Sequence, residues 1–301
     1  MSEMKTAVLF PGQGAQQVGM GREVLEHNAW AREMLAEAEE ISGLPLSRFC
    51  LEGPEAELIR TLNLQPALTV INLICWRAAT QAGLAGDCFA GHSLGEYAAL
   101  QAAGVLDFAD TIRLVTERGR LLEREAAANP GSMAAVVKLD IDTVAAIVEE
   151  VGDQGRLTVA NHNSAAQIVI SGENTAVAAA TALVKERGGK AIPLKVSGAW
   201  HSPLIAGAVA DFERFMAGIT FKPPQKPLYF NVTAAPEEDP AAIRALMARQ
   251  LASTVRWYEI VQQLQAAGVQ HFVEVGPGQV LSGLLKKILP ADSPCTIRQA
   301  P

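Results

Sequence analysis

The stretch CFAGHSLGEYAAL, residues 88–100, restricts the possible fold more than any other part of the chain. A short apolar segment is followed by GHSLG and then by an alanine-rich segment with helical character. The pattern G-x-S-x-G between a strand and a helix is typical of a sharp turn from which the serine side chain projects. The sequence therefore predicts an α/β arrangement at this point, with Ser93 on the turn.

Ser93 has two interpretations. As a nucleophile, it needs the small flanking residues Gly91 and Gly95 for a tightly packed turn, and the N–H groups at the start of the following helix face a developing oxyanion. As a structural residue, it only caps that helix, and the glycines are incidental. We favour the nucleophile because both the strand and the helix that the motif requires are present.

The chain before residue 128 repeats this alternation of strand, turn and helix. Residues 6–10 (TAVLF) read as a short buried strand that ends in the turn PGQGAQ. Helical periodicity follows in residues 22–41 and in residues 56–83, where Pro66 is expected to start or kink a helix. A further helix is expected at residues 107–125. These segments predict an α/β-hydrolase-like main domain.

Asn129-Pro130-Gly131 interrupts the alternation. The segments that follow predict the order β-α-β-β-α-β, which is the ferredoxin-like split pattern. We therefore expect a small ferredoxin-like domain at residues 129–196, inserted into a main domain made of residues 1–128 and 197–301. Such an insertion is tolerated when the two ends of the insert lie close together.

Composition excludes several classes of function. The chain has 301 residues, 49% of them hydrophobic, and a net charge of −7 without a long basic run, which argues against a nucleic-acid partner. It has no run of about 18 apolar residues, so no membrane span is expected. The N-terminus does not resemble a secretory signal, and the four cysteines lack metal-binding spacing. We expect a cytoplasmic monomer that needs no metal and no cofactor.

A serine hydroxyl needs a base, and the chain has five histidines. His92 adjoins Ser93, but neighbouring side chains on a turn point apart, so we expect it to support the loop or pocket. His201, in SGAWHSPL, lies in a loop of small residues where the chain re-enters the main domain, a good position for a catalytic group. We predict His201 as the base. No aspartate stands out as a third member, so either a carboxylate or a backbone carbonyl orients the imidazole.

The turn PGQGAQ, residues 11–16, also has two interpretations. It lacks the Lys-Ser/Thr of a P-loop and the third glycine of G-x-G-x-x-G, so phosphate binding is poorly supported. In α/β-hydrolase sites, an early loop of this kind supplies the second oxyanion donor, which would place Gln13 beside the Ser93 turn.

Six motifs occur in a characteristic order along the chain. They are FPGQGAQ, GHSLGEYAAL, ERGRLLE, SGAWHSPL, FNVTA and FVEVGPGQVL. Together they resemble the malonyl-CoA:acyl-carrier-protein transacylase family of fatty acid synthesis, which is related to the acyltransferase domains of polyketide synthases. The resemblance covers residues 10–289, nearly the whole chain.

The resemblance implies a role for each matching residue. It implies that Ser93 carries the acyl group as an ester and that His201 is its base. It further implies an oxyanion hole from the backbone N–H groups of Gln13 and Leu94. Gln250 matches the residue whose backbone carbonyl orients the histidine, which implies a Ser-His dyad.

Arg118 and Trp200 bear on the choice of acyl group. The resemblance implies that Arg118 binds the free carboxylate of malonyl, and a guanidinium suits this because it pairs with a carboxylate in a planar, bidentate way. Trp200 stands where malonyl-selective members often have Phe and methylmalonyl-selective domains often have Ser. The pocket that includes Trp200 and His92 is therefore expected to be narrow and to prefer malonyl over methylmalonyl.

The expected partners are malonyl-CoA and acyl carrier protein, which carries its own phosphopantetheine. Because the resemblance implies an acidic carrier, basic side chains are candidates for its docking: Lys185, Arg187, Lys190, Lys286 and Lys287. For each of them, a solvated helix charge is an equally good interpretation. The alternatives are an acyltransferase of a polyketide or malonate-decarboxylase pathway, a serine hydrolase or thioesterase, and a protein that docks to the carrier without transferring.

Overall fold

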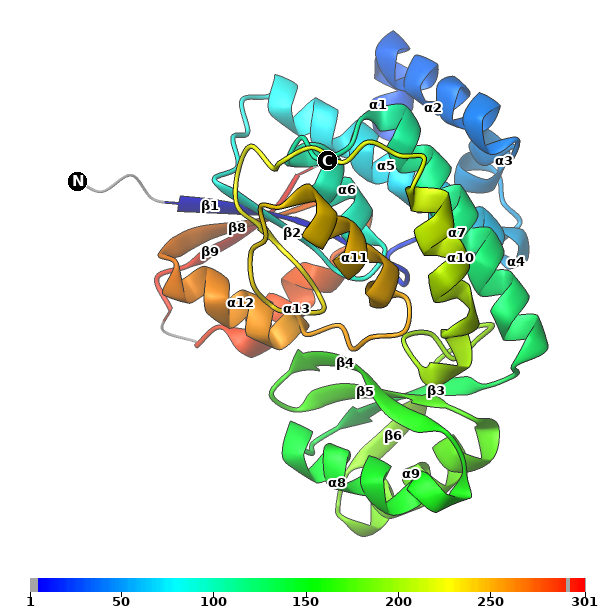
Figure 1. Cartoon of the computed structure of the whole chain (residues 1–301). Helices are drawn as coiled ribbons and strands as arrows, with labels where there is room; N and C mark the ends of the chain where they lie inside the picture. The colour runs from blue at the N-terminus through cyan, green and yellow to red at the C-terminus, as the bar shows by residue number, and fades with distance from the viewer. Residues whose placement is uncertain (1–4, 291–292, 301) are drawn as a thin grey trace.

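The computed structural model describes residues 5–290 and 293–300, whose strands form two separate sheets (Figure 1). The larger sheet has the order β7-β2-β1-β8-β9, and every neighbouring pair is parallel. Its strands are β1 (Lys5–Phe10), β2 (Cys88–Gly91), β7 (Leu228–Tyr229), β8 (Val269–Val275) and β9 (Thr296–Ala300). Because the strands are parallel, the turns after β1 and β2 meet at the same edge of the sheet.

Side chains of β1 alternate between two apolar layers. Val8 and Phe10 pack in the core formed with α5 (Thr61–Gln81) and α6 (Gly95–Ala102). Ala7 and Leu9 pack on the other face, against α12 (Trp257–Ala266) and α13 (Val280–Ile288). Successive side chains of a strand point to opposite faces, so a strand covered on both faces must be apolar throughout.

The other helices of this part pack around α5 and against one another. Helix α7 (Phe108–Ala128) lies against α5 and against α10 (Gly207–Met216), and the Asp107 side chain caps its first turn through Asp110 N. The remaining helices are α1 (Arg22–His27), α2 (Ala29–Ser42), α3 (Leu46–Leu51), α4 (Glu55–Leu58), the short 3-10 helix η2 (Pro203–Ile205) and α11 (Pro240–Gln250).

The smaller sheet follows the predicted order of elements. These are β3 (Ser132–Val137), α8 (Ile141–Val151), the 3-10 helix η1 (Gly152–Gln154), β4 (Leu157–Ser164), β5 (Gln167–Gly172), α9 (Asn174–Glu186) and β6 (Lys190–Pro193). The sheet order is β4-β5-β3-β6, and every pair is antiparallel. Helices α8 and α9 cover one face, while Met133, Ala135 and Val169 turn toward the core of the larger part.

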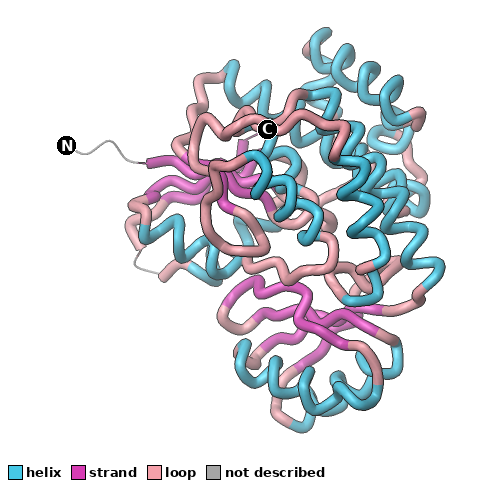
Figure 2. The backbone as a smooth tube through the Cα atoms, in the orientation of Figure 1, coloured by secondary structure: helices cyan, strands magenta, loops and turns pink. Residues whose placement is uncertain are grey.

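Backbone hydrogen bonds join β4 of the smaller sheet to Val255, in the loop before α12. Val255 N donates to Ala160 O, and His162 N donates to Val255 O. Figure 2 shows loops, drawn in pink, running between the two sheets at this junction. Residues of β4 are thereby held next to the turns at the carboxyl edge of the larger sheet.

Two details differ from the sequence-based expectation. Helix α5 begins at Thr61 and continues through Pro66, so the expectation that this proline starts a helix is wrong. Proline removes one hydrogen bond near the beginning of a long helix, and the burial of most of α5 offsets that loss. Strand β9 was not expected, because TIRQA has little apolar character and becomes a strand only through pairing with β8.

No helix within residues 5–290 and 293–300 is long and apolar enough to cross a lipid bilayer.

Candidate active site

Ser93 stands on a crowded turn between β2 and α6. Its φ is 50°, in the left-handed region that is costly for a residue with a side chain. A Cβ on Gly91 would lie 2.0 Å from the Gly95 carbonyl carbon, and a Cβ on Gly95 would lie 2.0 Å from Phe10 O. The backbone therefore requires glycine on both sides of Ser93, which explains the spacing of the motif.

The loop after β1 packs directly against this turn. A Cβ on Gly12 would lie 2.2 Å from His92 O, so the two backbones are in close contact. This approach places Gln13 in the wall of the cavity that contains Ser93. Within the described part of the chain, the backbone N–H groups of Gln13 and Leu94 have no protein acceptor, so both are available to an oxyanion.

His201 lies beside Ser93 although 108 positions separate them in sequence. Ser93 Oγ is 2.7 Å from His201 Nε2, and His201 Nδ1 is 3.0 Å from the Gln250 backbone oxygen. A carbonyl oxygen only accepts, so Nδ1 carries the proton and Nε2 accepts from the serine hydroxyl. Burial, and next the charge of Arg118, lower the pKa of His201 to about 3. The imidazole is therefore a neutral base near neutral pH.

His92 points away from the serine hydroxyl. Its Nε2 is 2.8 Å from Asn163 Oδ1 of β4, and its ring meets Trp257 edge-on at 5.5 Å. His92 also lines the cavity. The other histidines contact residues outside this cavity: His27 with the Glu23 backbone, His162 with Glu259 and His271 with Thr296.

Arg118 is buried in the same cavity, with 2% of its surface exposed. Its Nη1 donates to Gln65 Oε1 and its Nη2 to Gln250 Oε1, at 3.1 Å for the second bond. The guanidinium also lies over the Tyr97 ring, 5.5 Å from its centre. Arg118 Nε has no protein partner among the described residues. This N–H is therefore free to donate to an oxygen atom of a bound molecule.

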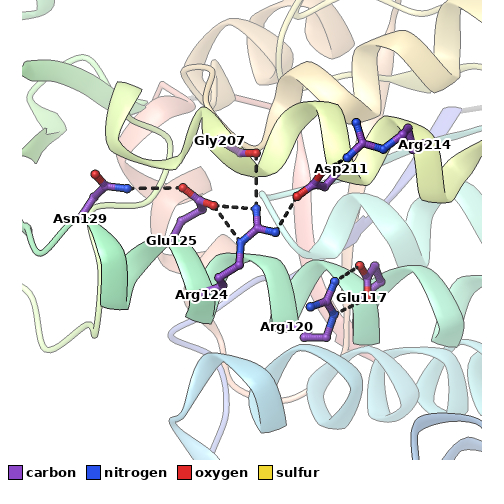
Figure 3. A network of polar contacts seen from close by, with 8 residues as sticks. All are labelled: Glu117, Arg120, Arg124, Glu125, Asn129, Gly207, Asp211 and Arg214. Atoms are coloured by element: carbon purple, nitrogen blue, oxygen red, sulfur yellow. Dashed lines mark hydrogen bonds and ion pairs between the residues drawn. The ribbon is translucent and has the colours of Figure 1, made fainter.

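The other arginines of α7 are exposed and paired with carboxylates. Arg113 pairs with Asp110, and Arg120 with Glu117. Figure 3 shows Arg124 between Glu125 and Asp211, a network that joins α7 to α10. Arg118 thus differs from the other arginines of α7 because it is buried. The spacing of arginines along the helix did not show which of them is buried.

The cavity around Ser93 is small, with a volume of about 100 Å³. Trp200, 7% exposed, forms part of its wall. The rest of that side is apolar: Leu122, Met133, Leu194, Val196 and Leu251. Ser93, His201 and Arg118 are thus enclosed between the turns of the larger sheet and the smaller sheet, with little room beside Trp200.

Several polar residues of the site were missed from the sequence. Gln65 holds Arg118, and Asn161 and Asn163 come from β4 of the smaller sheet. Asn231 accepts from Ser93 N at 2.7 Å and donates to Gly91 O at 2.7 Å. Asn231 belongs to the FNVTA motif, so that motif was the available signal for it. Nothing in the local sequence around Gln65 distinguishes it from other residues of a buried helix.

The candidate docking residues are all on the surface, on or next to α9 and α13. Arg187 pairs with Glu150, and Lys287 Nζ donates to Gln167 Oε1 at 2.8 Å. Lys185, Lys190 and Lys286 are exposed. Across the described residues, no cluster of three or more His, Cys, Asp and Glu side chains could hold a metal ion.

A serine on a strand-to-helix turn, with an imidazole on its hydroxyl and two available amides beside it, is the arrangement of α/β enzymes that form acyl-serine intermediates. Comparison with known proteins identifies the group within this class. The chain belongs to the acyl transferase family, because the model of the acyl transferase domain matches residues 8–296.

Individual relatives and solved structures are similar to this chain over nearly its whole length. The malonyl CoA-acyl carrier protein transacylase of Bacillus subtilis is 41% identical over 286 residues, which cover 94% of this chain and 90% of that protein. The crystal structure of malonyl-CoA:acyl carrier protein transacylase from Xanthomonas oryzae is 42% identical, with a TM-score of 0.94 over 99% of this chain and 95% of that one. A type II polyketide acyl carrier protein has been solved in complex with its malonyl-transacylase, PlMCAT:AntF. One chain of that complex is 37% identical to this protein, with a TM-score of 0.92. The comparison covers 98% of this chain and 94% of that one.

Proposed function

We propose that the protein transfers the malonyl group of malonyl-CoA to the phosphopantetheine thiol of acyl carrier protein, which supplies extender units for fatty acid synthesis. The observation that carries this proposal is the buried Arg118, whose guanidinium lines the same cavity as Ser93. Malonyl differs from acetyl by a free carboxylate, which a guanidinium binds strongly and selectively. The names of the relatives support the same activity.

In the first half-reaction, Ser93 Oγ attacks the thioester carbonyl of malonyl-CoA while His201 Nε2 takes the hydroxyl proton. The N–H groups of Gln13 and Leu94 donate to the oxyanion that forms. The carbon–sulfur bond then breaks, and His201 returns the proton to the CoA sulfur, which leaves a malonyl ester on Ser93. The Gln250 carbonyl keeps the imidazole in the required tautomer, in the position that aspartate has in a triad.

In the second half-reaction, the thiol of the carrier's phosphopantetheine attacks the ester by the reverse route. His201 takes the thiol proton and gives it to the Ser93 oxygen as the ester bond breaks. Neither half-reaction needs a metal or a cofactor. The apolar wall that includes Leu122, Trp200 and Leu251 disfavours water near the ester, which supports transfer to a thiol over hydrolysis.

The partner surface in this proposal includes exposed basic residues of two segments of the chain. Lys286 and Lys287 lie on α13, and Lys185, Arg187 and Lys190 lie on and after α9. The net charge of the chain is −7, so its overall charge would repel an acidic carrier protein. These local positive charges would attract it.

We also propose a two-domain description of the chain. Residues 129–196 would form a ferredoxin-like domain within an α/β-hydrolase-like main domain of residues 1–128 and 197–301. The sheet order β4-β5-β3-β6 with antiparallel pairs supports the ferredoxin-like description. The cytoplasmic location and the monomeric state expected from the sequence stay predictions.

The direct experiment is mass spectrometry of the intact protein after mixing with malonyl-CoA. The expected result is one malonyl adduct on Ser93, its absence in Ser93→Ala, and its removal by holo acyl carrier protein with malonyl appearing on the carrier. An adduct that persists in Ser93→Ala would contradict the mechanism. Rapid loss of the adduct without a thiol acceptor would favour a hydrolase, and transfer only to polyketide carriers would favour that pathway.

A further inference from the structure

Glu96 is a buried carboxylate three residues after Ser93 that the proposed reaction does not use. Only 1% of its surface is exposed, on the first turn of α6. Its Oε1 accepts from Asn231 N and its Oε2 from Gln250 Nε2, both at 2.7 Å. Burial raises the pKa of Glu96 to about 8, and these two N–H donors and the charge of Arg118 act in the opposite direction. Both hydrogen bonds favour the ionised carboxylate.

The carboxylate determines which way the Gln250 amide is turned. Above this pKa the carboxylate is ionised and only accepts hydrogen bonds, so the Gln250 amide presents its nitrogen to Glu96. Its oxygen then faces Arg118, whose Nη2 donates to it at 3.1 Å. The flipped amide would place two acceptors together at Glu96 and two donors together at Arg118, and all three side chains are buried, so the mismatch would be costly.

Gln250 also contacts both members of the Ser93–His201 pair. Its Nε2 donates to Ser93 O at 2.8 Å, and its backbone oxygen accepts from His201 Nδ1 at 3.0 Å. One residue therefore touches the serine turn, the base and Arg118. Any change in the Gln250 side chain is transmitted to the nucleophile and to the carboxylate-binding group at the same time.

The second partner of Glu96 acts on the same turn. The Asn231 backbone N–H is held by Glu96, and the Asn231 side chain bonds Ser93 N and Gly91 O, on the two sides of the turn. Asn231 follows β7, so Glu96 joins a third segment of the chain to the nucleophile. These bonds help to hold Ser93 in its left-handed conformation.

We propose that Glu96 is a positioning residue that couples recognition of the substrate carboxylate at Arg118 to the geometry of Ser93 and His201, by holding the Gln250 amide in one orientation. This inference rests on the proposed malonyl transfer. Glu96 touches no substrate atom in this scheme, and its effect passes through Gln250 and Asn231.

The test compares Glu96→Gln with the wild-type protein. The substitution keeps the size of the side chain, but its amide nitrogen competes with one of the two N–H donors. Rates of malonyl-serine and acetyl-serine formation from the two CoA thioesters are measured by quenched mass spectrometry, above the raised pKa of Glu96. We expect kcat to fall and KM for malonyl-CoA to rise, with the malonyl-over-acetyl preference reduced about tenfold or more.

Glu26→Gln is the matched control, because Glu26 is on the surface of α1 with 60% of its side chain exposed. It should keep the wild-type rates and preference. Urea unfolding of each variant and titration of the fraction of protein that forms an adduct show whether a loss comes from unfolding. A purely structural role for Glu96 would lower that fraction and leave the preference among folded molecules unchanged, which overturns the proposal.

The exchange variant Glu96→Gln with Gln250→Glu covers the case in which the single variant does not fold. It keeps one carboxylate and one amide in contact, but the carboxylate now faces Arg118 and competes with malonyl. The proposal expects a folded protein without malonyl preference, and restoration of the wild-type preference would overturn it. If the wild-type protein itself forms no malonyl-serine, the proposed function fails, and the inference fails with it.

Discussion

Ser93 Oγ and His201 Nε2 lie 2.7 Å apart, and both residues have left-handed backbones, with φ of 50° and 56°. Ser93 comes from the turn between β2 and α6, and His201 comes from the loop before η2. One hydrogen bond thus joins two residues that lie on separate segments and that both have an unusual backbone conformation. The pair exists only when the larger sheet and the loop that leaves the smaller sheet are both in place.

The lowered pKa of His201 makes folding stability depend on pH. The unfolded chain binds a proton on this residue at the ordinary pKa of 6.5, whereas the folded protein binds it at about 3. Between these values the unfolded state holds more protons, so stability falls as the pH falls from 6.5 toward 3, by up to about 1.4 kcal/mol per unit. The variant His201→Gln has no group that titrates at this position, so its free energy of unfolding should decrease less over the same pH range. Urea unfolding of both proteins across this range measures the difference, and parallel curves would contradict the assignment.

Arg118→Lys should impair malonyl loading despite keeping the charge. Lysine cannot make the planar, bidentate pair with a carboxylate, and it cannot bond Gln65 and Gln250 in the same geometry. The loss of about 1.5–3 kcal/mol of charge-assisted hydrogen bonding predicts roughly a 10- to 150-fold lower kcat/KM for malonyl-CoA. Acetyl-CoA loading, measured in parallel, should be retained or should rise. Equal losses for both substrates would remove the proposed carboxylate role.

Gly95→Ala should be severely destabilising, because its Cβ would lie 2.0 Å from Phe10 O. The backbone of β1 or of the Ser93 turn must move, which we expect to cost about 3 kcal/mol or more. Gly283→Ala on α13 is the control, since its Cβ would meet nothing within 4 Å. The control should gain about 0.5–1 kcal/mol, because alanine favours the helix. Denaturant unfolding measures whether the free energy of unfolding decreases in Gly95→Ala and increases in Gly283→Ala.

Trp200→Ser should widen the acyl pocket. Trp200 is 7% exposed and lines the cavity with Leu122 and Leu251, so its removal leaves space near the acyl α-carbon. We expect methylmalonyl-CoA to load at least several-fold faster relative to malonyl-CoA, since one methyl group in an apolar pocket is worth about 1–3 kcal/mol. Competition between the two thioesters, read by mass spectrometry, measures the ratio. An unchanged ratio would show that Trp200 does not limit the pocket.

Transfer to the carrier protein should weaken with added salt, whereas loading from malonyl-CoA should change less. Exposed charges such as Lys286 and Lys287 are screened over about 10 Å at 0.1 M salt. The double variant Lys286→Glu, Lys287→Glu should reduce kcat/KM for carrier protein and flatten its salt dependence. A separate variant, Lys185→Glu, tests the exposed charge on α9. A wild-type rate that is independent of salt would argue against charged docking.

Much of the larger architecture could be predicted from the local sequence. Short apolar segments before glycine-rich turns indicated β1 and β2, and the order β-α-β-β-α-β was visible in the smaller sheet. The polar network around Ser93 could not be predicted in this way. Glu96, Asn231 and Gln65 lie far apart in the chain, and each is an ordinary polar residue until the fold removes its water and supplies its partners.

By itself the sequence determined the Ser93 turn, because glycine is required at position 91 by a contact with Gly95 within the same turn. Its motifs also indicated which arginine and which histidine to examine. Only the tertiary structure decided that Arg118 alone among the arginines of α7 is buried, and that Gln250 joins it to Ser93, His201 and Glu96. The physical reason is that burial and hydrogen-bond partners depend on segments more than 100 residues apart, which no local pattern encodes.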